Sequence, residues 1–330
     1  MKIKLKYLPL LLLIIVASCS KDEVVEPTAE QTFGIRHDKS LSDYENIASS
    51  GNPNLPDFST VVFFNYSLDG SNNRDYVASG VVIDEEWILT AGHNFYDLSE
   101  QSTPAPKSGI LVKLGNNPNL STSTYSVSEI VFHPTWLAGN QELNHANDLC
   151  LIKVSNVISG VTPAVIFNQS NESLNSVVWH CGFGDYSKLS GQNPDLFSKK
   201  HAMSNILDRI KDGFQTSHAG ITYNGGLLAF DFDNPSGSIN SLGDAIVNED
   251  EGLLGNGTST AMALDFEGTT VSGDSGGPLF IFDNGVWKVA GILSGGADEP
   301  IPNHVDGNYG DISIYTRVST SYSWIQSVIQ

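Results

Sequence analysis

The stretch Gly273-Asp274-Ser275-Gly276-Gly277-Pro278, followed by the apolar run Leu279–Phe282, is the part of the sequence that decides the fold. A serine hydroxyl is a weak nucleophile unless a neighbouring base removes its proton. The oxyanion that forms when it attacks a carbonyl also needs hydrogen-bond donors nearby. Glycines on both sides of Ser275 allow a tight turn whose N–H groups point at that oxyanion. A loop between strands would explain the glycines alone, but the whole string predicts a nucleophilic Ser275.

Two further stretches supply the partners that such a serine needs. The run Trp87–Gly92 leads into His93, and an imidazole titrates near neutral pH, so it can take the serine proton and return it to a leaving group. Asp148 stands directly before the apolar run Leu149–Val154. An aspartate there can be a simple turn residue, or it can orient the imidazole and stabilise its protonated form.

Together these stretches resemble the trypsin and chymotrypsin family of serine proteases. The order His93, Asp148, Ser275 matches the chymotrypsin type and differs from the subtilisin and α/β-hydrolase orders. The resemblance implies an all-β chain with two six-stranded antiparallel β-barrels and a short C-terminal helix. It also implies a serine endopeptidase that hydrolyses peptide or protein substrates through an acyl-enzyme. It covers roughly residues 57–330 and is weak across 186–262.

The same resemblance assigns roles to further residues. The N–H groups of Gly273 and Ser275 would form the oxyanion hole. Thr269 would lie at the base of the primary pocket, and because it carries no carboxylate we expect cleavage after uncharged residues of small to medium size. Gly295 replaces the family's usual tryptophan and would open one wall of the cleft, while Ser313 would narrow the pocket. The substrate-binding residues expected in this way are Thr269, Ser294, Gly295, Gly296 and Ser313.

Activation and rival functions stay open at this stage. In the family a newly freed amine often pairs with the aspartate beside the serine, here Asp274, and a cut within Gly34–His37 would create one. The sequence shows no sure cleavage site. One rival is a catalytically inactive trypsin-fold protein that binds a surface partner, and another is a serine esterase. The intact residues at all three triad positions argue against the inactive protein, and hydrolysis of peptide rather than simple ester substrates would separate the protease from the esterase.

The N-terminal stretch predicts export and a lipid anchor. Three lysines within the first six residues precede the short apolar run Tyr7–Val16, which is a secretory signal rather than a comfortable membrane span. The string Val16-Ala17-Ser18-Cys19 resembles the bacterial lipobox, which implies that residues 1–18 are removed and that Cys19 carries lipid. The following Ser20–Glu23 resembles the signal that carries lipoproteins to the exterior of a bacterial outer membrane. Residues 19–33 would form a flexible tether; the alternative is an ordinary signal peptide with an incidental cysteine.

Composition limits the partners and cofactors. The formal net charge is -20 and hydrophobic residues make up 40% of the chain, so we expect a globular, monomeric protein that does not bind nucleic acid. No spacing of Cys and His suggests a metal site, and no cofactor is expected. Cys150 and Cys181 lie in apolar contexts and read as buried free thiols, with one disulfide as the alternative. The segment 231–260 reads as a solvated surface loop, with calcium binding as its alternative. Its acidic residues are Asp231, Asp233, Asp244, Glu249, Asp250 and Glu251.

Short apolar runs separated by turn residues predict the strands of a protease domain spanning 34–330. The first barrel would span about 57–165, the second about 170–318, and the C-terminal helix about 320–330. A second, weaker helical pattern covers Ser204–Lys211. The predicted strands are Val61–Phe64, Ser79–Ile83, Trp87–Leu89, Ile110–Leu114, Ile130–Phe132, Leu149–Val154, Val177–Trp179, Leu228–Phe232, Leu279–Phe282, Val286–Leu293 and Ile312–Val318.

Overall fold

The computed structural model describes residues 34–121, 123–186, 198–297 and 306–330. The predicted signal peptide, the lipidated Cys19 and the tether up to residue 33 lie outside the described residues. Within the described ranges, no helix combines the length and the apolar character needed to cross a membrane.

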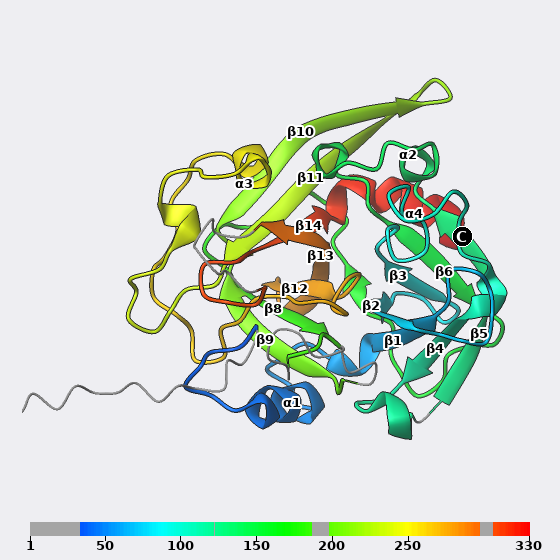
Figure 1. Ribbon diagram of the computed structural model, residues 1–330, viewed down its shortest axis with the longest axis horizontal. Coiled ribbons are helices and arrows are strands. Elements are labelled where there is room, and N and C mark those ends of the chain that lie inside the picture. Colours follow the sequence, from blue (N-terminus) through cyan, green and yellow to red (C-terminus); the bar gives the residue numbers. More distant parts are fainter. Residues whose placement is uncertain (1–33, 122, 187–197, 298–305) are drawn as a thin grey trace, which may run out of the picture. The chain divides into compact units, whose positions relative to one another are not determined.

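The first half of the protease domain is a closed antiparallel barrel (Figure 1). Its strand order is β1-β2-β3-β6-β5-β4. Every residue of β1 is buried, whereas β4 alternates, with Ile110, Val112 and Leu114 pointing inward. The six strands are β1 (Val61–Tyr66), β2 (Tyr76–Val82), β3 (Trp87–Thr90), β4 (Ile110–Leu114), β5 (Ser123–Phe132) and β6 (Cys150–Val154).

The second half is an eight-stranded sheet of order β10-β11-β14-β13-β12-β8-β9, with the short β7 paired to β13. The resemblance implied six strands here. Two features account for the difference. β7 is a two-residue addition, and the strand pairing is interrupted at Leu207 and Asp208, so that β9 and β10 are separate strands at opposite ends of the sheet order. The strands are β7 (Val165–Ile166), β8 (Val177–Gly182), β9 (His201–Ile206), β10 (Arg209–His218), β11 (Ile221–Asp231), β12 (Pro278–Asp283), β13 (Val286–Ala297) and β14 (Ile312–Arg317).

The predicted C-terminal helix is confirmed as α4 (Tyr322–Ile329), but the helix predicted over Ser204–Lys211 is wrong. Those residues form the end of β9 and the start of β10. An unpredicted helix, α1 (Leu41–Ser49), contacts β9, and β9 is buried at nearly every position. A strand covered on both faces loses the alternation that identifies strands in a sequence. The other helices are α2 (Pro134–Leu137) and α3 (Glu249–Leu254).

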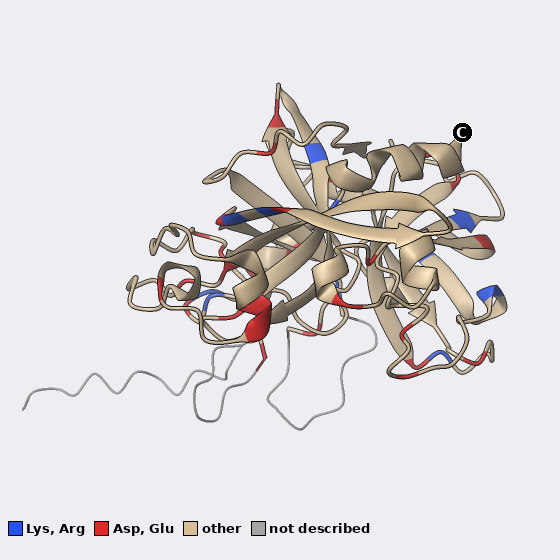
Figure 2. Cartoon of the chain, turned by 90° about the horizontal axis from the view of Figure 1, so that it is seen from above, with Lys and Arg blue, Asp and Glu red and all other residues tan. Residues whose placement is uncertain are grey.

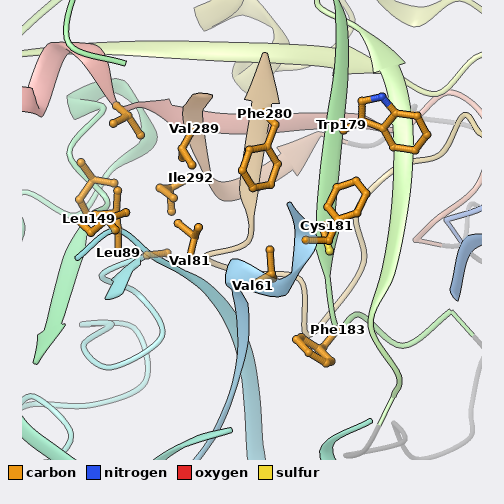
Figure 3. Packing of buried hydrophobic residues seen from close by; sticks show 14 of the residues in the cluster. Val61, Val81, Leu89, Leu149, Trp179, Cys181, Phe183, Phe280, Val289 and Ile292 are labelled. Atoms are coloured by element: carbon orange, nitrogen blue, oxygen red, sulfur yellow. The ribbon is translucent and has the colours of Figure 1, made fainter. Parts of the chain in front are cut away.

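The barrel and the sheet share a hydrophobic core (Figure 3). Burying one large apolar side chain contributes about 1.5–3 kcal/mol, so this cluster contributes much of the energy that fixes the two halves against each other. The predicted triad residues adjoin strands that border this core, because His93 follows β3, and Asp148 and Ser275 precede β6 and β12. Val61, Val81, Leu89 and Leu149 contribute from the barrel side, and Trp179, Phe280, Val289 and Ile292 from the sheet.

Two composition-based predictions have different outcomes. Cys150 and Cys181 are free and buried, as the free-thiol prediction states. The segment 231–260, predicted as a solvated loop, instead has a folded interior, because Asp231, Asp233 and Glu251 are buried and α3 lies within it. Its backbone N–H groups explain this burial: Leu242 donates to Asp231 and Val247 donates to Glu251. Lys and Arg of the described residues are scattered over the fold (Figure 2).

Candidate active site

Antiparallel pairing brings His93 and Asp148 together. Thr90, at the end of β3, pairs with Cys150, at the start of β6, so the residues just beyond β3 meet those just before β6. The His93 Nδ1 lies 2.7 Å from Asp148 Oδ2, and the His93 backbone N–H donates to Asp148 Oδ1 at 2.9 Å. With Nδ1–H directed at the carboxylate, the other ring nitrogen, Nε2, is the one available as a base.

The environment of the pair favours a basic imidazole. Burial alone would lower the pKa of His93, but the charge of Asp148 and its hydrogen bond raise that pKa above its usual value. A third group, the Ser294 hydroxyl, donates to Asp148 Oδ2 at 2.7 Å. Ser294 is the extra residue of a bulge in β13, where the register with β14 shifts between Leu293 and Gly295. Bulges of this kind redirect a side chain, here toward the aspartate.

Ser275 lies in a tight turn fixed against the barrel. Gly276 has a φ of +82°, and a Cβ there would lie 2.1 Å from the Thr90 side chain, so only glycine fits. The Ser275 carbonyl accepts hydrogen bonds from the Ser79 N–H at 2.9 Å and from the Asn94 side chain at 3.2 Å. Since Asn94 follows His93 directly, this bond holds the serine turn beside the imidazole. Asn94 carries no motif that would have marked it in the sequence.

The two predicted oxyanion donors are the N–H groups of Gly273 and Ser275. Gly273 has a φ of +99°, which turns its N–H away from the ordinary strand direction. Among the described residues, neither N–H donates to a backbone carbonyl or a side chain. Both N–H groups are therefore free to donate to a negatively charged oxygen, which is what an oxyanion hole requires.

Comparison with known proteins agrees with this geometry. A family model described as Trypsin matches residues 58–225 and 238–325. The chain belongs to the trypsin family. It is 24% identical to Serine protease 41 of Homo sapiens over 262 residues, which cover 78% of this chain and 70% of that protein. It is also 24% identical to Testisin of Homo sapiens over 266 residues, covering 77% of this chain and 70% of that protein. Urokinase-type plasminogen activator of Gallus gallus is 24% identical over 323 residues, covering 94% of this chain and 62% of the relative.

This trypsin-family chain is therefore a serine-type endopeptidase, a hydrolase whose substrates are peptides or proteins. A cavity of about 200 Å³ opens beside its Ser275. The buried Ser313 hydroxyl lies 2.9 Å from Oγ1 of the lining residue Thr269 and accepts a hydrogen bond from the Thr270 N–H at 3.1 Å. The residues lining the cavity are Thr269, Thr270, Val271, Ser272, Ser275, Leu293, Gly295, Gly296, Asp306, Asp311 and Ile312.

The structure places the predicted substrate-binding residues in two groups. Thr269, Gly295 and Gly296 line the cavity, and a Cβ on Gly295 would meet nothing within 4 Å, so that wall is open. Ser313 is fully buried and contacts the lining residues Thr269 and Thr270, and Ser294 contacts Asp148 instead of lining the cavity.

Sequence reasoning missed two carboxylates that line the same cavity. Asp306 and Asp311 lie just before β14, in a stretch without a motif. Asp311 is buried, and its Oδ2 accepts a hydrogen bond from the Gly307 N–H at 2.6 Å.

The predicted activation residue, Asp274, has a fully buried carboxylate surrounded by side chains of this same chain. Tyr186, His180 and His201 contact it, and none of the three belongs to a family motif that marked them in the sequence. The nearby Gly182 and Gly184 leave room for the carboxylate, because a Cβ on either glycine would overlap it. In the described ranges, no three His, Cys, Asp or Glu side chains are grouped as a metal ion would require.

Proposed function

We propose that this endopeptidase cleaves peptide bonds with Ser275 as the nucleophile, His93 as the general base and acid, and Asp148 as the group that orients and stabilises the imidazole. The observation that carries the proposal is the His93–Asp148 pair, in which Nδ1 lies 2.7 Å from Oδ2. The Ser275 carbonyl is hydrogen-bonded to the side chain of Asn94, the residue after His93, so the serine turn is attached next to this pair. The pairing leaves Nε2 of His93 as the acceptor for the serine proton.

In the first half of the reaction, the Ser275 oxygen bonds to the scissile carbonyl carbon while its proton passes to His93 Nε2. The carbonyl oxygen becomes negative and is held by the Gly273 and Ser275 N–H groups. The C–N bond then breaks, and His93 gives its proton to the leaving amine. In the second half, water bonds to the acyl carbon, His93 takes the water proton, and the Ser275 oxygen leaves with that proton restored.

Labelling with a fluorophosphonate, which forms a covalent bond with an activated serine, tests this proposal. The full chain is compared with Ser275→Ala and with His93→Ala. We expect labelling of the parent, none of Ser275→Ala, and slow labelling of His93→Ala. Hydrolysis of a peptide substrate by the parent then distinguishes a peptidase from an esterase. If the parent stays unlabelled even after limited proteolysis, the chain is a binding protein with an inactive site.

The cavity supports cleavage after uncharged residues of small to medium size. Thr269 and Thr270 line the cavity, their hydroxyl groups contact the buried Ser313 hydroxyl, and none of these three residues carries a charge. Asp306 and Asp311 also line the cavity, and their carboxylates would disfavour an acidic side chain there. Digestion of a peptide library and mass spectrometry of the products test this. Preferred cleavage after Lys or Arg, which the same carboxylates would attract, would overturn the uncharged preference.

The cellular location rests on the N-terminal sequence. Cys19 in a lipobox-like string supports an exported, outer-membrane lipoprotein that faces the cell exterior. Incorporation of a labelled fatty acid into the parent but not into Cys19→Ser tests the anchor. Protease accessibility on intact cells tests the side of the membrane, and full protection there would contradict the exterior location.

We also propose that the enzyme acts as a monomer and that its reaction needs no cofactor, since His93, Asp148 and Ser275 supply the nucleophile and both proton transfers. Peptidase activity measured with and without a chelator of divalent cations tests the second point. A loss of activity that calcium restores would support the calcium alternative for segment 231–260. Sedimentation of the detergent-extracted chain tests the first point.

A further inference from the structure

The carboxylate of Asp274, directly before the nucleophile, is completely withdrawn from solvent. Its Oδ1 accepts a hydrogen bond from the Gly184 N–H at 2.8 Å. Its Oδ2 accepts one from the Tyr186 hydroxyl at 2.6 Å and one from the Val271 N–H at 3.1 Å. A Cβ on Gly184 would lie 2.3 Å from Oδ2, so this contact depends on glycine.

Two buried imidazoles complete the surroundings of this carboxylate. The Nε2 of His201 lies 3.2 Å from Oδ1, and the Nε2 of His180 lies 3.5 Å from it. The His201 ring packs edge-on against Tyr186 with 3.8 Å between centroids, and the His180 Nδ1 lies 3.1 Å from the Tyr315 hydroxyl. We call His180, His201 and Tyr186 the Asp274 clamp.

The clamp stabilises the buried charge of the Asp274 carboxylate. A buried carboxylate without a cationic or hydrogen-bonding partner is strongly destabilising. Burial alone would raise the pKa of Asp274, but its electrostatic interaction with the nearby imidazoles of His201 and His180 lowers that pKa far below its usual range, while burial lowers the pKa of His180 itself. Among the described residues, no Lys or Arg forms an ion pair with this carboxylate.

The position of Asp274 links the clamp to catalysis. Its two neighbours in the chain are Gly273 and Ser275, whose N–H groups would form the oxyanion hole. Its own backbone is held on both sides, because its N–H donates to the Val271 carbonyl at 3.0 Å and its carbonyl accepts from Gly277 at 2.7 Å. If the side chain left the buried site, the peptide groups on either side would have to rotate with it.

The residues at the expected activation site, Gly34 and Ile35, pack close to the Asp274 clamp. Ile35 is fully buried and bridges to Gly268, and the Gly34 carbonyl accepts a hydrogen bond from the Thr269 N–H at 2.9 Å. Gly34 packs so closely on the Tyr186 ring that a Cβ there would lie 2.3 Å from it. In the uncut chain, Gly34 therefore holds the Tyr186 ring of the clamp in place, and moving Gly34 away would remove this contact.

We infer that the Asp274 clamp positions the oxyanion donors in the uncut chain, so that activity needs no newly freed amine near Gly34–His37. This inference rests on the proposed function of Ser275. The clamp side chains are positioning residues, since they touch Asp274 and not the substrate.

The first experiment asks which chains are active. The full chain is purified without any protease treatment and labelled with a fluorophosphonate, and the intact masses of labelled molecules are measured. We expect labelled molecules that retain the residues ahead of Gly34. If only chains beginning at or after Gly34 are labelled, the inference is wrong while the proposed function stands. If no form is labelled, the proposed function itself fails.

The second experiment asks whether the clamp acts on catalysis rather than on stability alone. Tyr186→Phe removes one hydroxyl from Asp274, and we expect kcat to fall about tenfold with little change in KM. Tyr125→Phe is the matched control, because that buried tyrosine hydroxyl accepts a hydrogen bond from Ser159 in the first half of the domain. We expect its kcat to equal that of the parent.

His201→Ala is the stronger variant, with an expected loss of about a hundredfold in kcat. Because removal of a buried ring can prevent folding, its thermal unfolding is measured first, and Tyr186→Phe decides the matter if His201→Ala does not fold. Equal kcat for Tyr186→Phe and Tyr125→Phe would overturn the positioning role.

Discussion

At the scale of single residues, a substitution of Ser294 tests how much its hydrogen bond to Asp148 contributes to catalysis. Its hydroxyl donates to Asp148 Oδ2 at 2.7 Å, and a hydrogen bond to a charged group contributes about 1.5–3 kcal/mol. We expect Ser294→Ala to lower kcat/KM about tenfold, because Asp148 holds the imidazole less firmly. Ser155→Ala, which removes an exposed hydroxyl bonded to the Ser126 carbonyl, is the control. An unchanged kcat/KM for Ser294→Ala would show that His93 alone fixes Asp148.

The pH dependence of cleavage follows from the environment of His93. The imidazole accepts the serine proton only when it is neutral, and Asp148 raises its pKa above the usual value of 6.5. The acid side of the kcat/KM profile should therefore have its midpoint above pH 6.5, with activity rising as protons leave. Hydrolysis of a neutral peptide from pH 5 to pH 9 measures this. A midpoint below pH 6 would contradict the assignment of His93 as the base.

How far the site could be predicted depends on whether residues are neighbours in the chain. Ser275 with its glycines, and His93 after its strand, are short contiguous signals. His180, His201 and Tyr186 come from three separate places and meet only at Asp274. Nothing in a single sequence marks such a meeting, because each residue has an ordinary local context.

At the scale of elements, apolar runs predicted the strands best where one short run formed one strand. The runs that became β1, β3 and β12 are bounded by turn residues, so their limits were readable. β10 and β11 form a long hairpin with a bulge near Gly213, and only the apolar end, Leu228–Phe232, was predicted. The exposed half of that hairpin has little apolar alternation, and hairpin pairing rather than burial holds it in place.

The contact of Gly34 with the Tyr186 ring and with Thr269 can be tested by substituting two glycines. Gly34 and Gly51 both have positive φ, +74° and +60°, so alanine strains the backbone at each by about 1–2 kcal/mol. Only at Gly34 would the new methyl group meet atoms, the Tyr186 ring and the Thr269 carbonyl. We expect both variants to lower Tm and only Gly34→Ala to lower kcat as well. Equal kcat in the two variants would mean that the segment does not support the clamp.

At the scale of the whole molecule, the net charge of -20 hides a cluster of buried acids. Asp208, Asp231, Asp233 and Glu267 are all at least 96% buried. Burial, followed by the charges of the neighbouring acids, raises the pKa of Asp233 to about 9 and that of Asp208 to about 8. Burial likewise raises the pKa of Glu267 to about 7. Sequence composition counts these carboxylates as surface charge, because it does not show which acids lie inside.

The cluster should make the protein less stable in alkaline solution. The folded chain keeps these protons at pH values where the unfolded chain has released them, so the stabilisation is full below about pH 4 and is lost as pH rises through 7 to 9. Each such group changes the free energy of unfolding by at most about 1.4 kcal/mol per pH unit. We expect Tm to fall from pH 6 to pH 9, and Asp233→Asn, which carries no charge at either pH, to lose several degrees less. Asp244→Asn removes an exposed carboxylate of the same segment and should follow the parent. If Asp233→Asn also follows the parent, the folded chain does not hold a proton on Asp233 near neutral pH.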